Sequence, residues 1–143
     1  MRTLKIIFTF FVLTFFVSNL IEAANQKYKY DQKATVSGKL VVTNFYGPPG
    51  YGEDPENDSV EKQCILYLDG PIDVVATNPK EEIDITEKNV KKITLVPSKG
   101  MNCNIINKKR IRATGTFFHA STGHHHTDIL MDVDSFSIIK KKK

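Results

Sequence analysis

Residues 115–133 read GTFFHASTGHHHTDILMDV and hold all four histidines of the 143-residue chain. Apolar and polar side chains alternate on both sides of residues 121–123, which have the composition of a turn. An alternation with a period of two is typical of half-buried strands. The stretch therefore predicts two antiparallel strands, over residues 109–119 and 127–133, joined by a short turn.

The histidines at this turn allow two interpretations. Neutral imidazole suits Zn²⁺, Ni²⁺ and Cu²⁺, and Asp128 is positioned in the sequence to add an oxygen ligand or to orient a ring. The possible divalent-metal ligands are His119, His124, His126 and Asp128. The alternative interpretation is that the histidines and threonines form a polar, hydrogen-bonded end of the hairpin that binds no metal ion. Ser121 with a histidine and Asp128 lacks a nucleophile-elbow context, which makes a hydrolase the weakest alternative.

Residues 47–58 read GPPGYGEDPEND, and their three glycines and three prolines prevent regular structure. Four carboxylates lie here, with no Lys or Arg between Gly47 and Glu61. Loops of this length often carry function, so we expect a binding surface formed by this acidic loop and the histidine turn. Its predicted residues are Tyr46, Tyr51, Glu53, Asp54, His119, Thr122, His124, His125 and His126.

Short alternating runs recur along the rest of the chain. The expected strands begin near residue 34 and cover residues 62–69, with a continuation at 72–74, then 90–96, 109–119 and 127–133. Gly38 lies inside the first run and predicts a bend. Five or six short strands with almost no helix predict an all-β fold, a small antiparallel OB-like barrel, with a β-sandwich as the alternative. In such a barrel the acidic loop and the histidine turn lie at the loops that border a ligand.

The N-terminus has the pattern of a secretory signal peptide. Arg2 and Lys5 precede an apolar run over residues 6–17, and small residues follow. We expect cleavage after Ala23 in preference to Ala24, an exported protein in the periplasm or outside the cell, and no stable membrane anchor after cleavage. The predicted organisation is a signal peptide at 1–23, a loose polar arm at 24–33, one β-domain at 34–139 and a basic tail at 140–143.

Cysteine use and charge narrow the classes of function. Cys64 and Cys103 predict a disulfide in an oxidising compartment, with two buried free thiols as the alternative. The net charge is +4, and Lys140 to Lys143 supply four positive charges, so the folded body is near neutral. A nucleic-acid surface needs a clustered basic face, so we expect no nucleic-acid partner, and a monomer.

Two resemblances add to these patterns. The segment GTFFHASTGHHHT followed by ILMDV, together with VSGKL at 36–40 and FYGPPGYG at 45–52, resembles a family of bacterial secreted domains of unknown function. That resemblance covers about residues 34–139 and implies a shared fold and surface without an activity. More distantly, the bent first strand, the long first loop and the strand beginning KKRIRATG resemble small secreted OB-fold domains.

The sequence therefore favours a non-enzymatic secreted binding module whose ligand is unknown. No nucleophile and base occur at a recognisable spacing. The expected partner is an envelope protein, a peptide or a glycan. A metal-binding envelope protein and a hydrolase are the alternatives.

Overall fold

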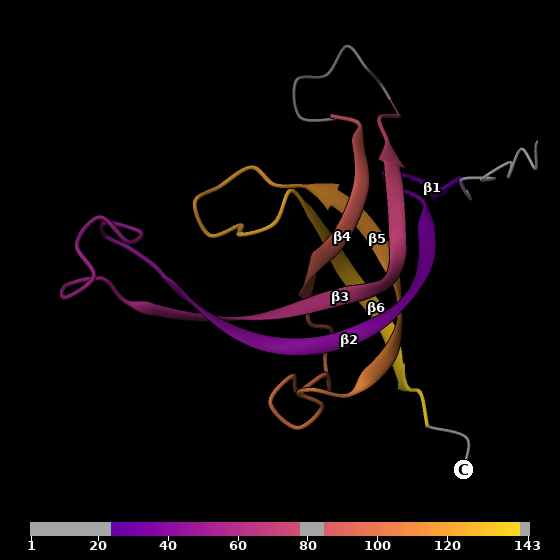
Figure 1. Cartoon of the computed structure of the whole chain (residues 1–143). Coiled ribbons are helices and arrows are strands. Elements are labelled where there is room, and N and C mark those ends of the chain that lie inside the picture. Colours follow the sequence, from indigo (N-terminus) through magenta and orange to yellow (C-terminus); the bar gives the residue numbers. More distant parts are fainter. Residues whose placement is uncertain (1–23, 78–84, 141–143) are drawn as a thin grey trace, which may run out of the picture.

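The computed structural model describes residues 24–77 and 85–140, and this part of the chain is all β (Figure 1). The strands are β1 (Gln26–Lys29), β2 (Lys33–Tyr46), β3 (Val60–Val75), β4 (Glu87–Val96), β5 (Arg110–His119) and β6 (Ile129–Ile138). They form one six-stranded sheet, which confirms the all-β prediction and differs from the two sheets of a sandwich. Within the described ranges, no helix has the length and apolarity needed to cross a membrane.

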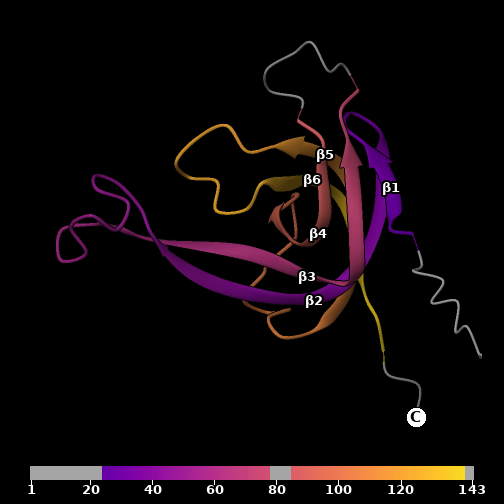
Figure 2. The ribbon, with the colours of Figure 1, turned by 45° about the horizontal axis from the view of Figure 1, so that its top comes forward.

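The sheet curls so that five of its strands close partly into a ring. The strand order is β1-β3-β2-β5-β6-β4, and β3 also pairs with β4 (Figure 2). The closure is partial because β4 meets β6 only over Thr94–Val96 and Leu130–Asp132. The β4–β6 and β1–β3 pairings are parallel, whereas the sequence predicted an antiparallel arrangement throughout.

The interior of the ring is filled by side chains that alternate along the strands, as a period of two requires. The largest fully buried side chains of this interior include Leu40, Leu66, Ile93, Ile111, Phe117, Ile129 and Met131. Gly38 in β2 and Gly115 in β5 sit where neighbouring backbone leaves no room for a side chain. A Cβ at either position would lie 2.1 Å from a carbonyl oxygen, of Tyr67 and Asp132 respectively. The predicted bend at Gly38 is therefore a site of close strand approach.

The N-terminal arm is the clearest correction to the sequence analysis. Residues 24–33 were expected to be loose, but Gln26–Lys29 pairs with Ile72–Val75, on the edge of β3 that β2 leaves unpaired. Tyr30 follows and is 3% exposed, and its hydroxyl donates a hydrogen bond to the carbonyl of Ile85 at 2.6 Å. Most side chains of this strand are polar, so the sequence shows no apolar alternation there. The two-residue spacing of Tyr28 and Tyr30 is the one sign of the strand period.

Several boundaries also differ from the predicted ones. β3 continues as one strand through Gly70 and Pro71, with irregular pairing to β4. β6 begins at Ile129, two residues later than expected, and extends to Ile138. The predicted disulfide between Cys64 and Cys103 is present, with a Cα–Cα distance of 6.0 Å, and ties the loop before β5 to β3. The predicted signal peptide with its cleavage site after Ala23, and most of the basic tail, lie outside the described residues.

Candidate functional site

Residues 120–128, which we call the histidine loop, join β5 to β6 and extend from the ring on the same side as the hairpin of β2 and β3 (Figure 2). Three consecutive residues of β3 are buried, Cys64, Ile65 and Leu66. Successive side chains of a strand point to opposite faces. Cys64 and Leu66 belong to the interior core, so Ile65 is buried on the outside of the ring.

The strand register assembles an outer patch around Ile65. Ile65 lies opposite Thr94 of β4, which lies opposite Leu130 of β6, which lies opposite Phe118 of β5. Ile65 and Leu130 are each 2% exposed, although neither belongs to the interior core. This outer patch is therefore a second, smaller buried cluster on the opposite side of the sheet.

Thr127 attaches the histidine loop to this outer patch. Its hydroxyl oxygen accepts hydrogen bonds from the backbone N–H of Thr94 at 2.9 Å and from the Thr94 hydroxyl at 2.8 Å. The Thr127 hydroxyl donates in turn to the carbonyl of Ile129 at 2.7 Å. At the base of the loop, the backbone N–H of Ala120 donates to the carbonyl of Asp128 at 2.9 Å. These bonds explain why β6 begins at Ile129 and not at Thr127.

Two histidines of the loop share one carboxylate, that of Glu61. The Nδ1 atom of His124 lies 2.5 Å from Oε1 of Glu61, and Nε2 of His126 lies 3.5 Å from Oε2. The ring of His126 stacks on Phe45 with a centroid distance of 4.0 Å and an interplanar angle of 4°. Phe45 and Glu61 face each other across β2 and β3, so the two imidazoles contact the two members of one cross-strand pair.

The acidic loop, residues 47–58, reaches the histidine loop through Tyr51. The Tyr51 hydroxyl lies 3.3 Å from Nε2 of His124, although the two residues are 73 positions apart in the sequence. The same ring therefore contacts Glu61 through Nδ1 and the Tyr51 hydroxyl through Nε2. Gly123 packs on the Tyr51 ring, and the Gln63 amide donates to the carbonyl of His124. The two loops therefore form one continuous surface.

The acidic loop is shaped by one of its own carboxylates. The two oxygens of Asp58 accept the backbone N–H groups of Gly50 and Gly52, each at 2.6 Å. Asp54 accepts the side-chain amide of Asn57 at 2.7 Å and stays exposed, as does Glu53. The predicted surface residues Tyr46 and Tyr51 are 48% and 43% exposed. The tip of the β2–β3 hairpin thus presents two aromatic rings beside carboxylates.

His125 holds the turn of the histidine loop. Its ring Nδ1 accepts the backbone N–H of Ser121 at 2.9 Å, and the backbone N–H of His125 donates to the carbonyl of Thr122 at 3.0 Å. The ring meets the edge of Phe118 at 5.8 Å. Burial, followed by the neighbouring charges of His124 and His126, lowers the pKa of His125 below its ordinary value of 6.5.

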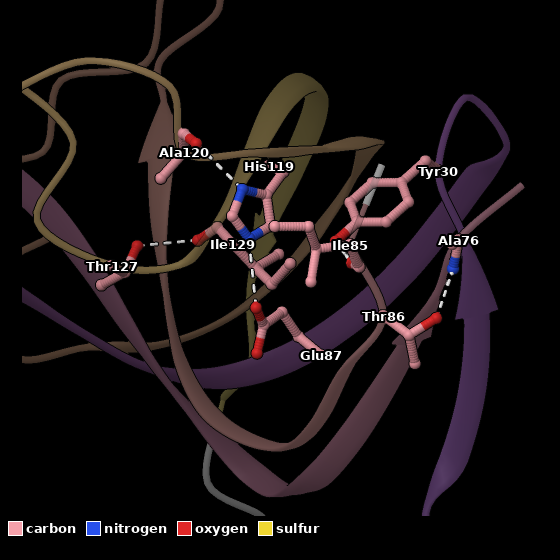
Figure 3. A network of polar contacts seen from close by, with 9 residues as sticks. All are labelled: Tyr30, Ala76, Ile85, Thr86, Glu87, His119, Ala120, Thr127 and Ile129. Atoms are coloured by element: carbon pink, nitrogen blue, oxygen red, sulfur yellow. Dashed lines mark hydrogen bonds and ion pairs between the residues drawn. The ribbon is translucent and has the colours of Figure 1, made fainter. Parts of the chain in front are cut away.

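His119 lies apart from the other three histidines, near the start of β4 (Figure 3). Its Nδ1 is 2.9 Å from the carbonyl of Ala120, and its Nε2 is 3.1 Å from Oε1 of Glu87. Both partners of the ring are hydrogen-bond acceptors, one a backbone carbonyl and the other a carboxylate. The ring also meets the buried ring of Tyr30 at 6.5 Å.

The geometry does not bring the expected metal ligands together. His119 contacts Glu87, whereas His124 and His126 contact Glu61. Among residues 24–77 and 85–140, no group of three or more His, Cys, Asp or Glu side chains is placed to hold a metal ion. Ser121, considered as a nucleophile, meets His125 through its backbone N–H.

Sequence reasoning missed the residues that anchor the histidine loop. These residues are Phe45, Glu61, Gln63, Thr94 and Thr127. The first three were visible only as alternate positions on the two strands that flank the acidic loop. Alternation predicts that Glu61, Gln63 and Ile65 share a face, but not that a loop from the other end of the chain covers it.

Comparisons with known proteins identify a domain family but no chemical activity. Residues 95–138 match a family model described as a domain of unknown function (DUF4431). The matched segment runs from the end of β4 to the end of β6 and contains the whole histidine loop. The resemblance to a domain of unknown function is thus supported for this segment, while residues 34–94 lie outside the match. No curated protein and no solved structure matches the chain.

Proposed function

We propose that this protein is a non-enzymatic, exported binding module, and that its binding surface is the joint face of the acidic loop and the histidine loop. The contact chain from Tyr51 through His124 to Glu61 carries the proposal. It joins two unusual loops from distant parts of the sequence into one surface. The disulfide between Cys64 and Cys103 is compatible with export to an oxidising compartment.

The exposed groups of this surface favour recognition. Tyr46 and Tyr51 offer rigid aromatic area with a polar tip, a residue type enriched at interfaces. The nearby carboxylates of Glu53 and Asp54 favour partners with cationic or hydrogen-bond-donating groups. We infer that the partner is an envelope protein, a peptide or a glycan.

The loops are also held in place before a partner arrives. Asp58 fixes the turn of the acidic loop, and Glu61 and Thr127 fix the histidine loop. A surface that is already ordered loses less conformational entropy on binding, which favours affinity. The placement of both loops agrees with an OB-like ring, in which the corresponding loops border the ligand.

An affinity experiment with the envelope fraction of the producing cell tests this proposal. The disulfide-bonded protein serves as bait beside a Tyr46→Ala/Tyr51→Ala variant, which removes the exposed aromatic area together with the Tyr51–His124 contact that joins the two loops. An Ile105→Ala variant is the matched control, because Ile105 is an exposed apolar residue in a different loop. We expect a partner that the parent protein and the control retain equally and that the double variant retains at least tenfold less.

Two results would contradict the proposal. Equal retention of the partner by the double variant would show that the joint face is not the binding surface. Turnover of a substrate by the purified protein that depends on His124 or Ser121 would favour a hydrolase instead.

A further inference from the structure

A row of exposed side chains crosses three neighbouring strands on the outer face of the ring. Tyr67 of β3 lies directly opposite Lys39 of β2 on one side and Lys92 of β4 on the other. All three are exposed, and Tyr67 is 46% exposed. Tyr67 lies two residues beyond Ile65, so it points to the same outer face as the outer patch.

This row opens into a groove along the edge of the histidine loop. Its lining combines Tyr67 of β3 and lysines of β4 with residues of the histidine loop. This lining includes Tyr67, Lys88, Lys91, Lys92, His126 and Asp128. The groove therefore brings an exposed aromatic ring and several ammonium groups to one place. It lies on the body of the ring, away from the tip that carries Tyr46 and Tyr51.

The nearby carboxylates are mostly bound to other groups. Asp69 receives two N–H groups of Arg110 at 2.8 to 3.2 Å, and this pairing raises the pKa of Arg110. Glu87, which borders the groove, faces His119 at 3.1 Å. Asp128 is the other carboxylate of the groove lining. The same lining holds three lysines, and the row adds Lys39. Among residues 24–77 and 85–140, the side chains of this face consequently carry more positive than negative charge.

We propose that this face binds an anionic glycan. The ring of Tyr67 would lie against one sugar ring, while Lys39 and Lys92 pair with acidic groups on the sugars to either side. Adjacent strands are about 4.8 Å apart, so the two lysine stems stand roughly 10 Å apart across the tyrosine. Surfaces for single-stranded nucleic acids stack successive bases on several aromatic rings, and this row holds one. The surface and its ligand class go beyond the binding face proposed above.

Calorimetric titration of the disulfide-bonded protein with a galacturonic acid oligosaccharide tests the inference, at low and at physiological salt. Two variants probe the face, Tyr67→Ala and Lys39→Gln/Lys92→Gln. A Lys62→Gln/Lys99→Gln variant is the control, because it removes the same charge from exposed lysines elsewhere. We expect both probe variants to bind at least tenfold more weakly, and the control to stay within about twofold of the parent protein.

Other outcomes overturn the inference. An undetectable affinity of the parent protein removes the ligand class, and an equal loss in the control variant reduces the effect to net charge. Unchanged binding by Tyr67→Ala removes the aromatic contact. Tighter binding of a single-stranded DNA of matched charge would reassign the face to nucleic acid. The Tyr46→Ala/Tyr51→Ala variant should bind the oligosaccharide normally, which separates this test from that of the proposed function.

Discussion

The interior core and the outer patch lie on opposite faces of the same strands but are built from different groups. The interior is almost wholly apolar, with Leu66 and Phe117 fully buried. The outer patch combines Ile65 and Leu130 with buried threonines and with imidazoles that meet Glu61. Burial of apolar side chains is strongly favoured because water makes no comparable interaction with them. Hydrogen bonds within the protein replace hydrogen bonds to water, so their net contribution to stability is small. The interior therefore fixes the fold, and the outer patch fixes the position of one loop.

The largest expected effect comes from neighbouring residues of β3 that point to opposite faces. Leu66→Ala should lower the free energy of unfolding by about 2–5 kcal/mol, because the closed interior cannot collapse onto the cavity. Ile65→Ala should cost about 2 kcal/mol, at the lower end of that range, because the histidine loop can settle onto the smaller side chain. Urea unfolding with the disulfide intact measures both. Equal losses would mean that the outer patch and the interior form one rigid core.

A smaller effect is expected from Thr127, the polar anchor of the outer patch. Thr127→Val keeps the shape but leaves the backbone N–H of Thr94 without its acceptor, which should cost about 1–3 kcal/mol. Thr122→Val, an exposed change in the same loop, is the matched control and should stay within about 0.5 kcal/mol. Thermal unfolding of both variants checks the difference, and a Thr127→Val protein as stable as the control would refute the anchor.

Glu61→Gln probes the attachment of the histidine loop through its imidazoles. Loss of the shared carboxylate charge should cost about 1 kcal/mol or less, because His124 is more than half exposed and solvent screens the pair. The stronger signal is local. Amide hydrogen exchange should accelerate in residues 120–128, while the interior strands keep their protection. Glu53→Gln at the exposed tip is the control. Unchanged exchange in the Glu61 variant would contradict the attachment of the histidine loop through Glu61.

The smallest expected effect is a response of the histidine loop to pH through His125. Its folded pKa lies below 6.5, so as the pH falls below that value the unfolded chain binds the proton more readily than the folded chain. The stabilising contribution of neutral His125 is complete above about pH 6.5 and is lost as the pH falls through the folded pKa. Protonation also removes the acceptor of the Ser121 N–H.

NMR titration of the His125 ring and amide exchange of Ser121 between about pH 5 and 7.5 follow both changes. The Ser121 amide should exchange faster on the acidic side, after correction for intrinsic exchange. A His125 ring that titrates above 6.5 in the folded protein would reverse the sign of the effect.

Local patterns predicted some parts of this molecule well. β5 was expected at residues 109–119 and lies at Arg110–His119, because alternation is strong there and a buried Phe117 anchors it. β1 was missed because its side chains are mostly polar, and its stabilising partner is an edge of β3 more than 40 residues away. At the candidate site, the tyrosines and histidines were identified, but Glu61 was not. Its role depends on a loop that follows it by about 60 residues.

Local patterns in the amino-acid sequence were enough to predict the all-β class, most of the strands, the disulfide and the two unusual loops. Those features depend on composition and on a period of two, which are local properties of the chain. The contacts of the histidines with Glu61 and Glu87, and the contact between the two loops, became visible only in the folded protein. Strand register and the partial closing of the ring set these contacts, and both follow from the packing of many distant side chains at once.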